Sequence, residues 1–149
     1  MSSPDGSTVT FRRAAGVARA SLERFAGKLQ EQVAKGRPFH CVITHDRELR
    51  RLNREFLGKD YATDVLSFPA LPGPEPHLGD IAISHQRARA QARLLGHETE
   101  QEIRILMLHG LLHLLGMDHE TDGGRMARAE KRWRERLGLP AGLIERQRP

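Results

Sequence analysis

Residues 98–119, ETEQEIRILMLHGLLHLLGMDH, contain the apolar segment that organises the rest of the chain. Its apolar side chains cover a broad surface of a helix and are Ile103, Leu106, Met107, Leu111 and Leu114. A helix with so wide an apolar surface is buried by its neighbours, so we expect it to be the central helix of the domain. Glu98, Glu100 and Glu102 lie in its first turn, where carboxylates favour a helix N-terminus. Gly116 is expected to close the helix in the left-handed conformation.

Strands and helices alternate in the prediction for the remaining sequence. Strands are expected at 8–11, 39–44, 65–68 and 78–84, because these stretches are apolar or alternate and end at turn residues. Helices are expected around 22–33, from an N-cap at Asp46 to Gly58, from an N-cap at Ser84 to Gly96, and at 123–137. Interleaved elements of this kind predict an α/β (α+β-like) fold with a small mixed four-stranded sheet packed by about five helices.

The composition limits the class of protein. The chain has 149 residues, which suits one domain, so we assign 1–7 to a disordered lead-in and 8–149 to a single domain. No apolar run approaches the ~20 residues that span a bilayer. Cys41 is the only cysteine, which excludes an intramolecular disulfide. We therefore expect a cytoplasmic protein rather than a membrane protein or a secreted disulfide scaffold.

The net charge of +5 is confined to one end of the chain. Residues 1–122 carry equal numbers of basic and acidic groups, whereas 123–149 hold three acids and eight basic residues. Those basic residues are Arg125, Arg128, Lys131, Arg132, Arg134, Arg136, Arg146 and Arg148. Such segregation is typical either of a polyanionic partner or of a solvated helix face, and charge alone leaves both open.

Three histidines at the end of the central helix are the strongest chemical signal. His109 and His113 are four residues apart and lie on one face of a helix, and a turn at Gly116 can bring His119 to the same place. A lone histidine on such a helix is usually a buried core residue. Three at ligand spacing instead predict a metal site, with Zn²⁺ as the default and nickel, cobalt or copper also compatible. Three protein ligands leave one coordination position open, as in catalytic zinc sites.

The spacing coincides with the metzincin signature of zinc proteases, with one change. Gly110 stands where that signature has its general-base glutamate, so peptide hydrolysis by that route lacks its base. Asp118, beside the third histidine, is a candidate to replace the base, or it orients His119. A further alternative is that the metal-bound water acts as hydroxide unaided, and in either case the zinc-protease interpretation is strongly disfavoured.

Two further stretches are unusual for so short a chain. Residues 59–69, KDYATDVLSFP, place Thr63 and Asp64 directly before a strand, and residues 78–81, LGDI, open another with Asp80. Local physics explains both as turn chemistry.

Taken together, these stretches resemble the YbeY family of bacterial ribosomal RNA maturation factors. The resemblance runs through Asn53, Gly58-Lys59-Asp60, residues 63–69, residues 78–81 and the full histidine motif, covering roughly 40–138. It implies a single α/β domain with one zinc per chain, held by His109, His113 and His119. It also implies a single-strand-specific endoribonuclease that acts in maturation of the 3′ end of 16S ribosomal RNA and in ribosome quality control. The implied partners are ribosomal RNA and the small ribosomal subunit, with no membrane and no DNA.

One departure from the family pattern concerns a functional arginine. Leu57 occupies the position where many members carry it, so Arg54 or Lys59 is expected to contact phosphate instead, with Arg87, Arg89 and Arg93 as further RNA-binding candidates. The catalytic candidates beyond the metal are Lys59, Asp64 and Asp118. The alternative is a non-catalytic, zinc-stabilised ribosome-assembly factor that binds ribosomal RNA.

Overall fold

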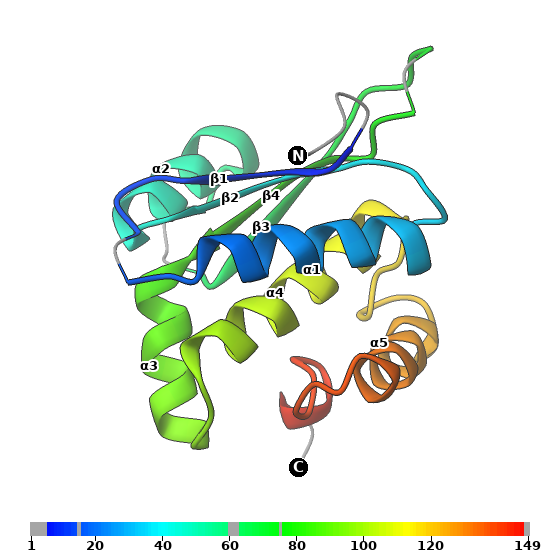
Figure 1. Ribbon diagram of the computed structural model, residues 1–149. Helices are drawn as coiled ribbons and strands as arrows, with labels where there is room; N and C mark the ends of the chain where they lie inside the picture. Colours follow the sequence, from blue (N-terminus) through cyan, green and yellow to red (C-terminus); the bar gives the residue numbers. More distant parts are fainter. Residues whose placement is uncertain (1–5, 15, 60–62, 75, 148–149) are drawn as a thin grey trace.

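The predicted alternation of strands and helices is confirmed in the computed structural model, which describes residues 6–14, 16–59, 63–74 and 76–147 (Figure 1). The strands are β1 (Thr8–Phe11), β2 (His40–Thr44), β3 (Val65–Pro69) and β4 (Gly79–Ser84). The helices are α1 (Arg19–Gln32), α2 (Asp46–Leu57), α3 (His85–Leu95), α4 (Thr99–Leu114) and α5 (Arg125–Arg136), with a short 3₁₀ turn at Glu145–Gln147.

The strands form one mixed sheet in the order β1-β2-β4-β3. β1 pairs with β2 and β2 with β4 in parallel, whereas β3 and β4 run antiparallel as a hairpin in which Val65 faces Ile83. The parallel pairs need helical crossovers, which α1 and α2 provide along the chain. The fold class and the four-stranded mixed sheet were therefore correctly predicted.

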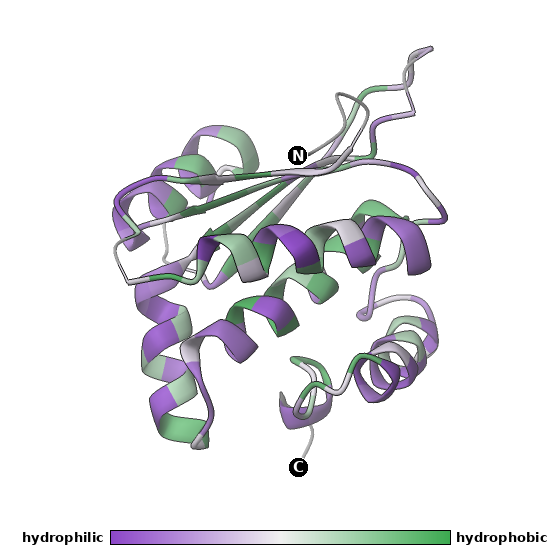
Figure 2. Ribbon diagram, in the orientation of Figure 1, coloured by the Kyte–Doolittle hydropathy of each residue, from purple (hydrophilic) through white to green (hydrophobic). Residues whose placement is uncertain are grey.

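The two faces of the sheet carry separate apolar clusters. In β4, Ile81 and Ile83 belong to the main core beneath α1 and α4, whereas Ala82 between them joins a smaller cluster beneath α2. This alternation follows from the two-residue period of a strand. Figure 2 shows the apolar colouring concentrated in the strands and α4, with hydrophilic residues prominent on α2, α3 and α5. No helix of the described chain is long and apolar enough to cross a membrane.

The helix caps predicted at Gly58, Ser84 and Gly96 are present. Helix α1 begins at Arg19 rather than near 22, α5 begins at Arg125 rather than at 123, and the cap predicted at Asp46 lies one residue earlier. His45, not Asp46, is the N-cap of α2, and its Nδ1 accepts a hydrogen bond of 3.4 Å from the Glu48 amide. Asp46 is instead the first helical residue, and its carboxylate accepts hydrogen bonds from Ser84 Oγ at 3.2 Å and Arg87 at 3.0 Å. Ser84 itself caps α3 as predicted, accepting from the Arg87 amide at 3.2 Å.

The ordered chain includes Ser7, which we had assigned to the lead-in. Its amide donates to Gln30 Oε1 at 2.6 Å and its hydroxyl accepts from the Phe39 amide at 3.0 Å, so Ser7 is tied to α1 and to the start of β2. Residues 1–5 of the predicted lead-in lie outside the described part of the chain.

Helix α4 lies so close to the sheet that one of its positions has no room for a side chain. A Cβ atom added at Gly110 would lie 2.8 Å from Ile81 Cγ2 and 3.2 Å from Ser67 Oγ. The Ser67 hydroxyl also donates a hydrogen bond of 3.0 Å to the Gly110 carbonyl, which ties β3 to α4. Gly110 is thus required by packing, and the position of the protease glutamate points at the sheet.

Introducing that glutamate should destabilise the protein rather than produce a protease. We expect Gly110→Glu to lower the free energy of unfolding by more than about 3 kcal/mol, because overpacking costs about 1–3 kcal/mol and an unpaired buried carboxylate adds more. Urea denaturation measures this loss. The matched control is Gly27→Ala in α1, where a Cβ meets nothing within 4 Å and the helix gains up to about 1 kcal/mol. A stable, folded Gly110→Glu variant contradicts the packing argument.

Candidate metal centre and surrounding pocket

The three predicted histidines meet in one place. His109 and His113 project from adjacent turns of α4, and Gly116, with φ of 92°, turns the chain so that His119 returns to them. Each contributes one potential ligand atom, and these three atoms lie within 4.8 Å of one another. The ring centroids of His109 and His113 are 4.9 Å apart, and His119 lies 5.7 Å and 5.8 Å from them. The spacing argument is confirmed at the level of geometry.

The ring of His109 is oriented by a buried carboxylate on α5. Glu130 is fully buried, and its Oε2 lies 2.7 Å from His109 Nδ1. An ionised carboxylate only accepts hydrogen bonds, so Nδ1 carries the proton and Nε2 keeps its lone pair for a cation. Carboxylate partners of this kind accompany histidine ligands in many metal sites.

The ring of His113 is oriented by a backbone carbonyl, which also holds the proton on Nδ1. Its Nδ1 lies 3.0 Å from the carbonyl oxygen of Met117, which can only accept, so Nδ1 donates and Nε2 is left for a ligand. Burial, followed by the neighbouring His109, lowers the pKa of His113 below its usual value and favours the neutral, metal-binding form.

His119 supplies the third observation that fits a cation. Its Nδ1 is buried and has no hydrogen-bond partner among the described residues. A buried ring nitrogen without a partner is costly unless something binds it. Three imidazoles with two oriented tautomers and one unpaired nitrogen therefore match the donor set of a transition-metal ion such as zinc.

The histidines line one wall of an open pocket of about 560 Å³. Two of the candidates predicted from the sequence, Lys59 and Asp118, line the same pocket, and so does Leu57. Leu57, at the position where many family members carry an arginine, therefore lines the pocket. Because this position holds leucine, Lys59 is the lysine or arginine residue in the pocket lining. Asn53, Thr63, Ser67 and Glu120 add polar groups to this lining.

Asp118 lies beside the histidines but is engaged in a turn. Its two carboxylate oxygens accept hydrogen bonds from the Glu120 amide at 3.1 Å and the Thr121 hydroxyl at 3.2 Å. The bond from Glu120 is the main reason that the pKa of Asp118 is lowered. No hydrogen bond joins Asp118 to His119 in the described structure, so the predicted orienting contact is absent there.

The remaining candidates do not line this pocket, although Thr63 and Val65 on either side of Asp64 do. Asp64 precedes β3, and its carbonyl accepts from the Ser84 amide at 2.9 Å, next to the start of α3. Arg87 is paired with Asp46 at 3.0 Å, and Arg87, Arg89 and Arg93 belong to α3, which packs beside the amino-terminal half of α4 (Figure 1). Arg54 is exposed on α2 outside the pocket lining. Asp60 lies outside the described residues.

The basic C-terminal region is less positive at its surface than its sequence indicates. Arg134 pairs with Glu145 through two contacts of 2.8 Å, and Arg146 pairs with the buried Glu102, one contact being 2.8 Å. Arg134 and Arg146 therefore form ion pairs within the protein. The exposed basic residues of α5 are Arg125, Arg128, Lys131, Arg132 and Arg136.

Glu130 is the site residue that sequence reasoning missed, because it was counted only as one acid of the basic tail. A signal for it exists in the pattern of α5. Met126 and Ala129 are buried on the inner face of that helix, and Glu130 follows Met126 at i+4 on the same face. A carboxylate on the apolar stripe of an amphipathic helix needs a partner inside the protein.

Comparison with known proteins agrees with this site. A family model described as "Endoribonuclease YbeY" matches residues 7–138. A protein named endoribonuclease YbeY from Solibacter usitatus is 68% identical over 147 residues, covering 98% of each chain. A protein of the same name from Koribacter versatilis is 47% identical and covers 91% of this chain and 88% of its own.

A solved structure shows the same fold at lower identity. The solution structure of TM1509 from Thermotoga maritima superimposes with a TM-score of 0.59 at 28% sequence identity, covering 85% of both chains. The histidine geometry, the fold and the match over residues 7–138 agree with one another. This chain belongs to the endoribonuclease YbeY family.

Proposed function

We propose that this protein is a zinc-dependent endoribonuclease that cuts single-stranded RNA. Its substrate is ribosomal RNA of the small subunit, where it acts in maturation of the 3′ end of 16S ribosomal RNA and in ribosome quality control. The observation that carries the proposal is the convergence of His109, His113 and His119 in a pocket that also contains Lys59. The shared name of the relatives supports the endoribonuclease activity. A ribosomal substrate places the protein in the cytoplasm.

The chain's own residues prepare the site for the metal. Glu130 and the Met117 carbonyl hold the protons on the Nδ1 atoms of His109 and His113, which leaves both Nε2 lone pairs available to hold a metal ion. Zinc held by His109, His113 and His119 would supply Lewis-acid polarisation of a phosphate oxygen or of water. The open pocket, rather than a sealed core, gives an RNA strand access to these side chains.

Contacts to the RNA backbone divide into two groups by position. Lys59 lies at the pocket and is the residue placed to neutralise the phosphate nearest the histidines. Arg54, Arg87, Arg89 and Arg93 lie outside it and are proposed to contact more distant parts of a longer RNA. Contacts of this second kind raise affinity without reading sequence.

The three catalytic candidates are not equivalent in their surroundings. Lys59 and Asp118 line the pocket, but the hydrogen bonds that lower the pKa of Asp118 make its carboxylate a weak proton acceptor. Burial raises the pKa of Asp64, whose electrostatic neighbours are Arg87, Glu102, Arg146 and Asp46 rather than the histidines. Lys59 is therefore the catalytic candidate that we retain.

Removal of one histidine tests the cleavage proposal directly. We expect His113→Ala to lower the rate of cleavage of single-stranded ribosomal RNA by at least about 100-fold. Loss of a residue that only hydrogen-bonds to a metal ligand lowers metal affinity or activity about 10- to 100-fold, and loss of the ligand itself should cost more. Gel analysis of a labelled RNA measures the rate. The control is His77→Ala, which alters a histidine on the exposed hairpin loop outside the pocket. Equal cleavage by His113→Ala and the unaltered protein rejects the proposal.

Metal removal separates an enzyme from the assembly-factor alternative. The main core holds together β-strand and helix residues that do not contact the histidine pocket, among them Leu22, Leu29 and Phe39. We therefore expect a chelator to abolish RNA cleavage while circular dichroism stays unchanged, and zinc to restore activity. A structural zinc site predicts the opposite, because the fold is then lost with the metal.

Replacement of Asp64 tests whether its half-buried carboxylate is functional. Because burial raises its pKa above the ordinary value of 3.8, the folded protein binds this proton more tightly than the unfolded chain, and stability falls as pH rises through that pKa. Asp64→Asn removes this loss, so we expect it to unfold at a higher temperature than the unaltered protein at pH 7. The difference in unfolding temperature between the variant and the unaltered protein should disappear as pH falls below 3.8. RNA cleavage should be retained, and its loss would instead assign Asp64 a role in the reaction.

A further inference from the structure

The last described stretch of the chain wraps onto the helix that supports the metal centre. Residues 139–146, which we call the C-terminal strap, follow α5 and lie beyond the 7–138 matched by the family. Leu139 and Ile144 of the strap are only 6% and 4% exposed, so they are part of the core rather than a loose extension.

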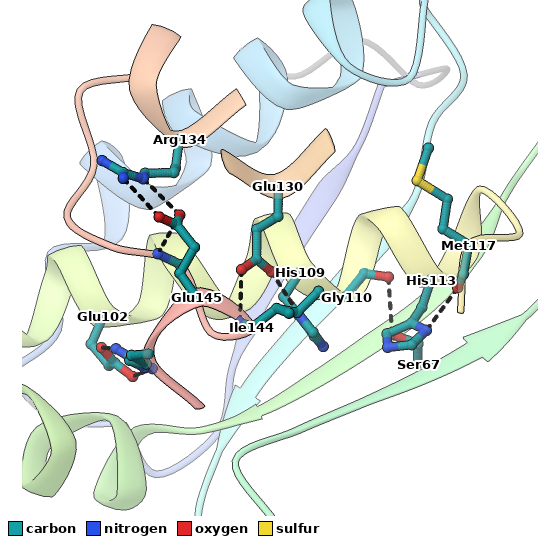
Figure 3. A network of polar contacts seen from close by, with 12 residues as sticks. Ser67, Glu102, His109, Gly110, His113, Met117, Glu130, Arg134, Ile144 and Glu145 are labelled. Atoms are coloured by element: carbon teal, nitrogen blue, oxygen red, sulfur yellow. Dashed lines mark hydrogen bonds and ion pairs between the residues drawn. The ribbon is translucent and has the colours of Figure 1, made fainter. Parts of the chain in front are cut away.

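The strap contacts the carboxylate that orients a metal ligand. The Ile144 amide donates a hydrogen bond of 2.8 Å to Glu130 Oε1, while Oε2 of the same carboxylate bonds His109 Nδ1 at 2.7 Å (Figure 3). Glu130 is fully buried, so these partners take the place of solvent around its charge. A chain of two hydrogen bonds therefore joins the strap backbone to His109.

Two ion pairs hold the strap in place, one to a residue of α5 and the other to a residue of α4. Glu145 accepts two bonds of 2.8 Å from Arg134 of α5 and also binds the Gly142 amide at 3.2 Å. Arg146 binds Glu102 in the first turns of α4, and the fully buried Glu102 also bonds His97 Nε2 at 2.8 Å. Side chains of α4 and α5 thus determine where the Ile144 amide lies.

We propose that the C-terminal strap positions His109 as a metal ligand by holding Glu130, which makes Glu130 a positioning residue of the metal site. The inference rests on the metal-dependent function proposed above. The Ile144 amide occupies one carboxylate oxygen and so directs the other at His109 Nδ1. With its proton held on Nδ1, His109 presents Nε2 to the metal, and a released carboxylate lets the ring take the other tautomer.

Gly142 provides a substitution that acts on this contact. A Cβ added there would lie 2.2 Å from Glu130 Oε1 and 2.7 Å from its Cδ. The atoms that must move are the end of the Glu130 side chain, and the φ of Gly142 is outside the left-handed region, so alanine adds no backbone strain. Gly142→Ala therefore displaces the carboxylate while leaving the apolar side chains of the strap in place.

The experiment measures zinc affinity and histidine tautomer in the full chain. We expect Gly142→Ala to bind zinc about 10- to 100-fold more weakly than the unaltered protein, by competition with a chromogenic chelator. In the metal-free protein at pH 8, ¹⁵N NMR of the imidazole rings should show His109 protonated at Nδ1, and a mixture of tautomers in the variant. Gly27→Ala, a glycine-to-alanine change with nothing within 4 Å, should alter neither measurement.

Each outcome decides between positioning and mere structural support. A folded Gly142→Ala variant with unchanged zinc affinity and tautomer overturns the proposal, even if its unfolding temperature falls. If Gly142→Ala does not fold, Glu145→Gln weakens the Arg134 anchor and the Gly142 contact from the outer side, and the same two readouts apply. If both readouts shift in the variant and the unaltered, zinc-loaded protein fails to cut RNA, the strap proposal is supported and the cleavage proposal is rejected. Absence of zinc binding by the unaltered protein rejects the proposed function, while the tautomer of His109 still tests the strap.

Discussion

The contact between α4 and the sheet at Gly110 is the constraint on which the rest of the structure depends. Without a side chain there, the helix backbone approaches Ile81 and Ser67 closely enough for Ser67 to bond the Gly110 carbonyl. With Gly110 against the sheet, His109 and His113 lie one turn apart on a face that opens to the pocket. The rotation of α4 about its axis, and hence the direction of two ligands, follows from that contact.

Two buried carboxylates connect this helix to the end of the chain. Glu102 and Glu130 are fully buried, and such groups are tolerated only when their charge is met by hydrogen bonds or ion pairs. Glu102 is met by Arg146 and His97, and Glu130 by His109 and the Ile144 amide. Removal of one partner leaves a buried charge unpaired, which costs about 3–5 kcal/mol. The C-terminal region is therefore part of the structural support of the histidine cluster.

These ion pairs also change the meaning of the basic tail. The sequence places all of the net charge in 123–149, but Arg134 and Arg146 neutralise Glu145 and Glu102 inside the fold. The exposed cations that remain are spread over α5, while Arg87 of α3 is paired with Asp46. Lys59 is the basic residue of the pocket lining, which is why we propose that it binds the phosphate nearest the histidines. The net positive charge of residues 123–149 therefore favours a polyanionic partner, but it does not show where on this protein the reacting phosphate binds.

The sequence by itself determined the strands and helices, the mixed sheet and the three histidines, because each depends on short-range patterns. Apolar periodicity, glycine and proline at element ends, and ligand spacing within residues 109–119 are all local. The N-cap of α2 was misplaced by one residue, since His45 and Asp46 both suit that position and the contacts of Asp46 with Ser84 and Arg87 come from another element.

Only the tertiary structure decided which distant residues join the site. Glu130 bonds His109 although 21 positions separate them in the sequence, and Arg146 bonds Glu102 although 44 positions separate them. No local sequence pattern extends over such separations. Asp64 and the arginines of α3 were candidates in the sequence just as Lys59 was, but the packing of β3 and α3 leaves them out of the pocket lining. The physical reason is that the pairing of a buried charge is settled by the three-dimensional packing of elements, whereas the sequence shows only that the charge is present.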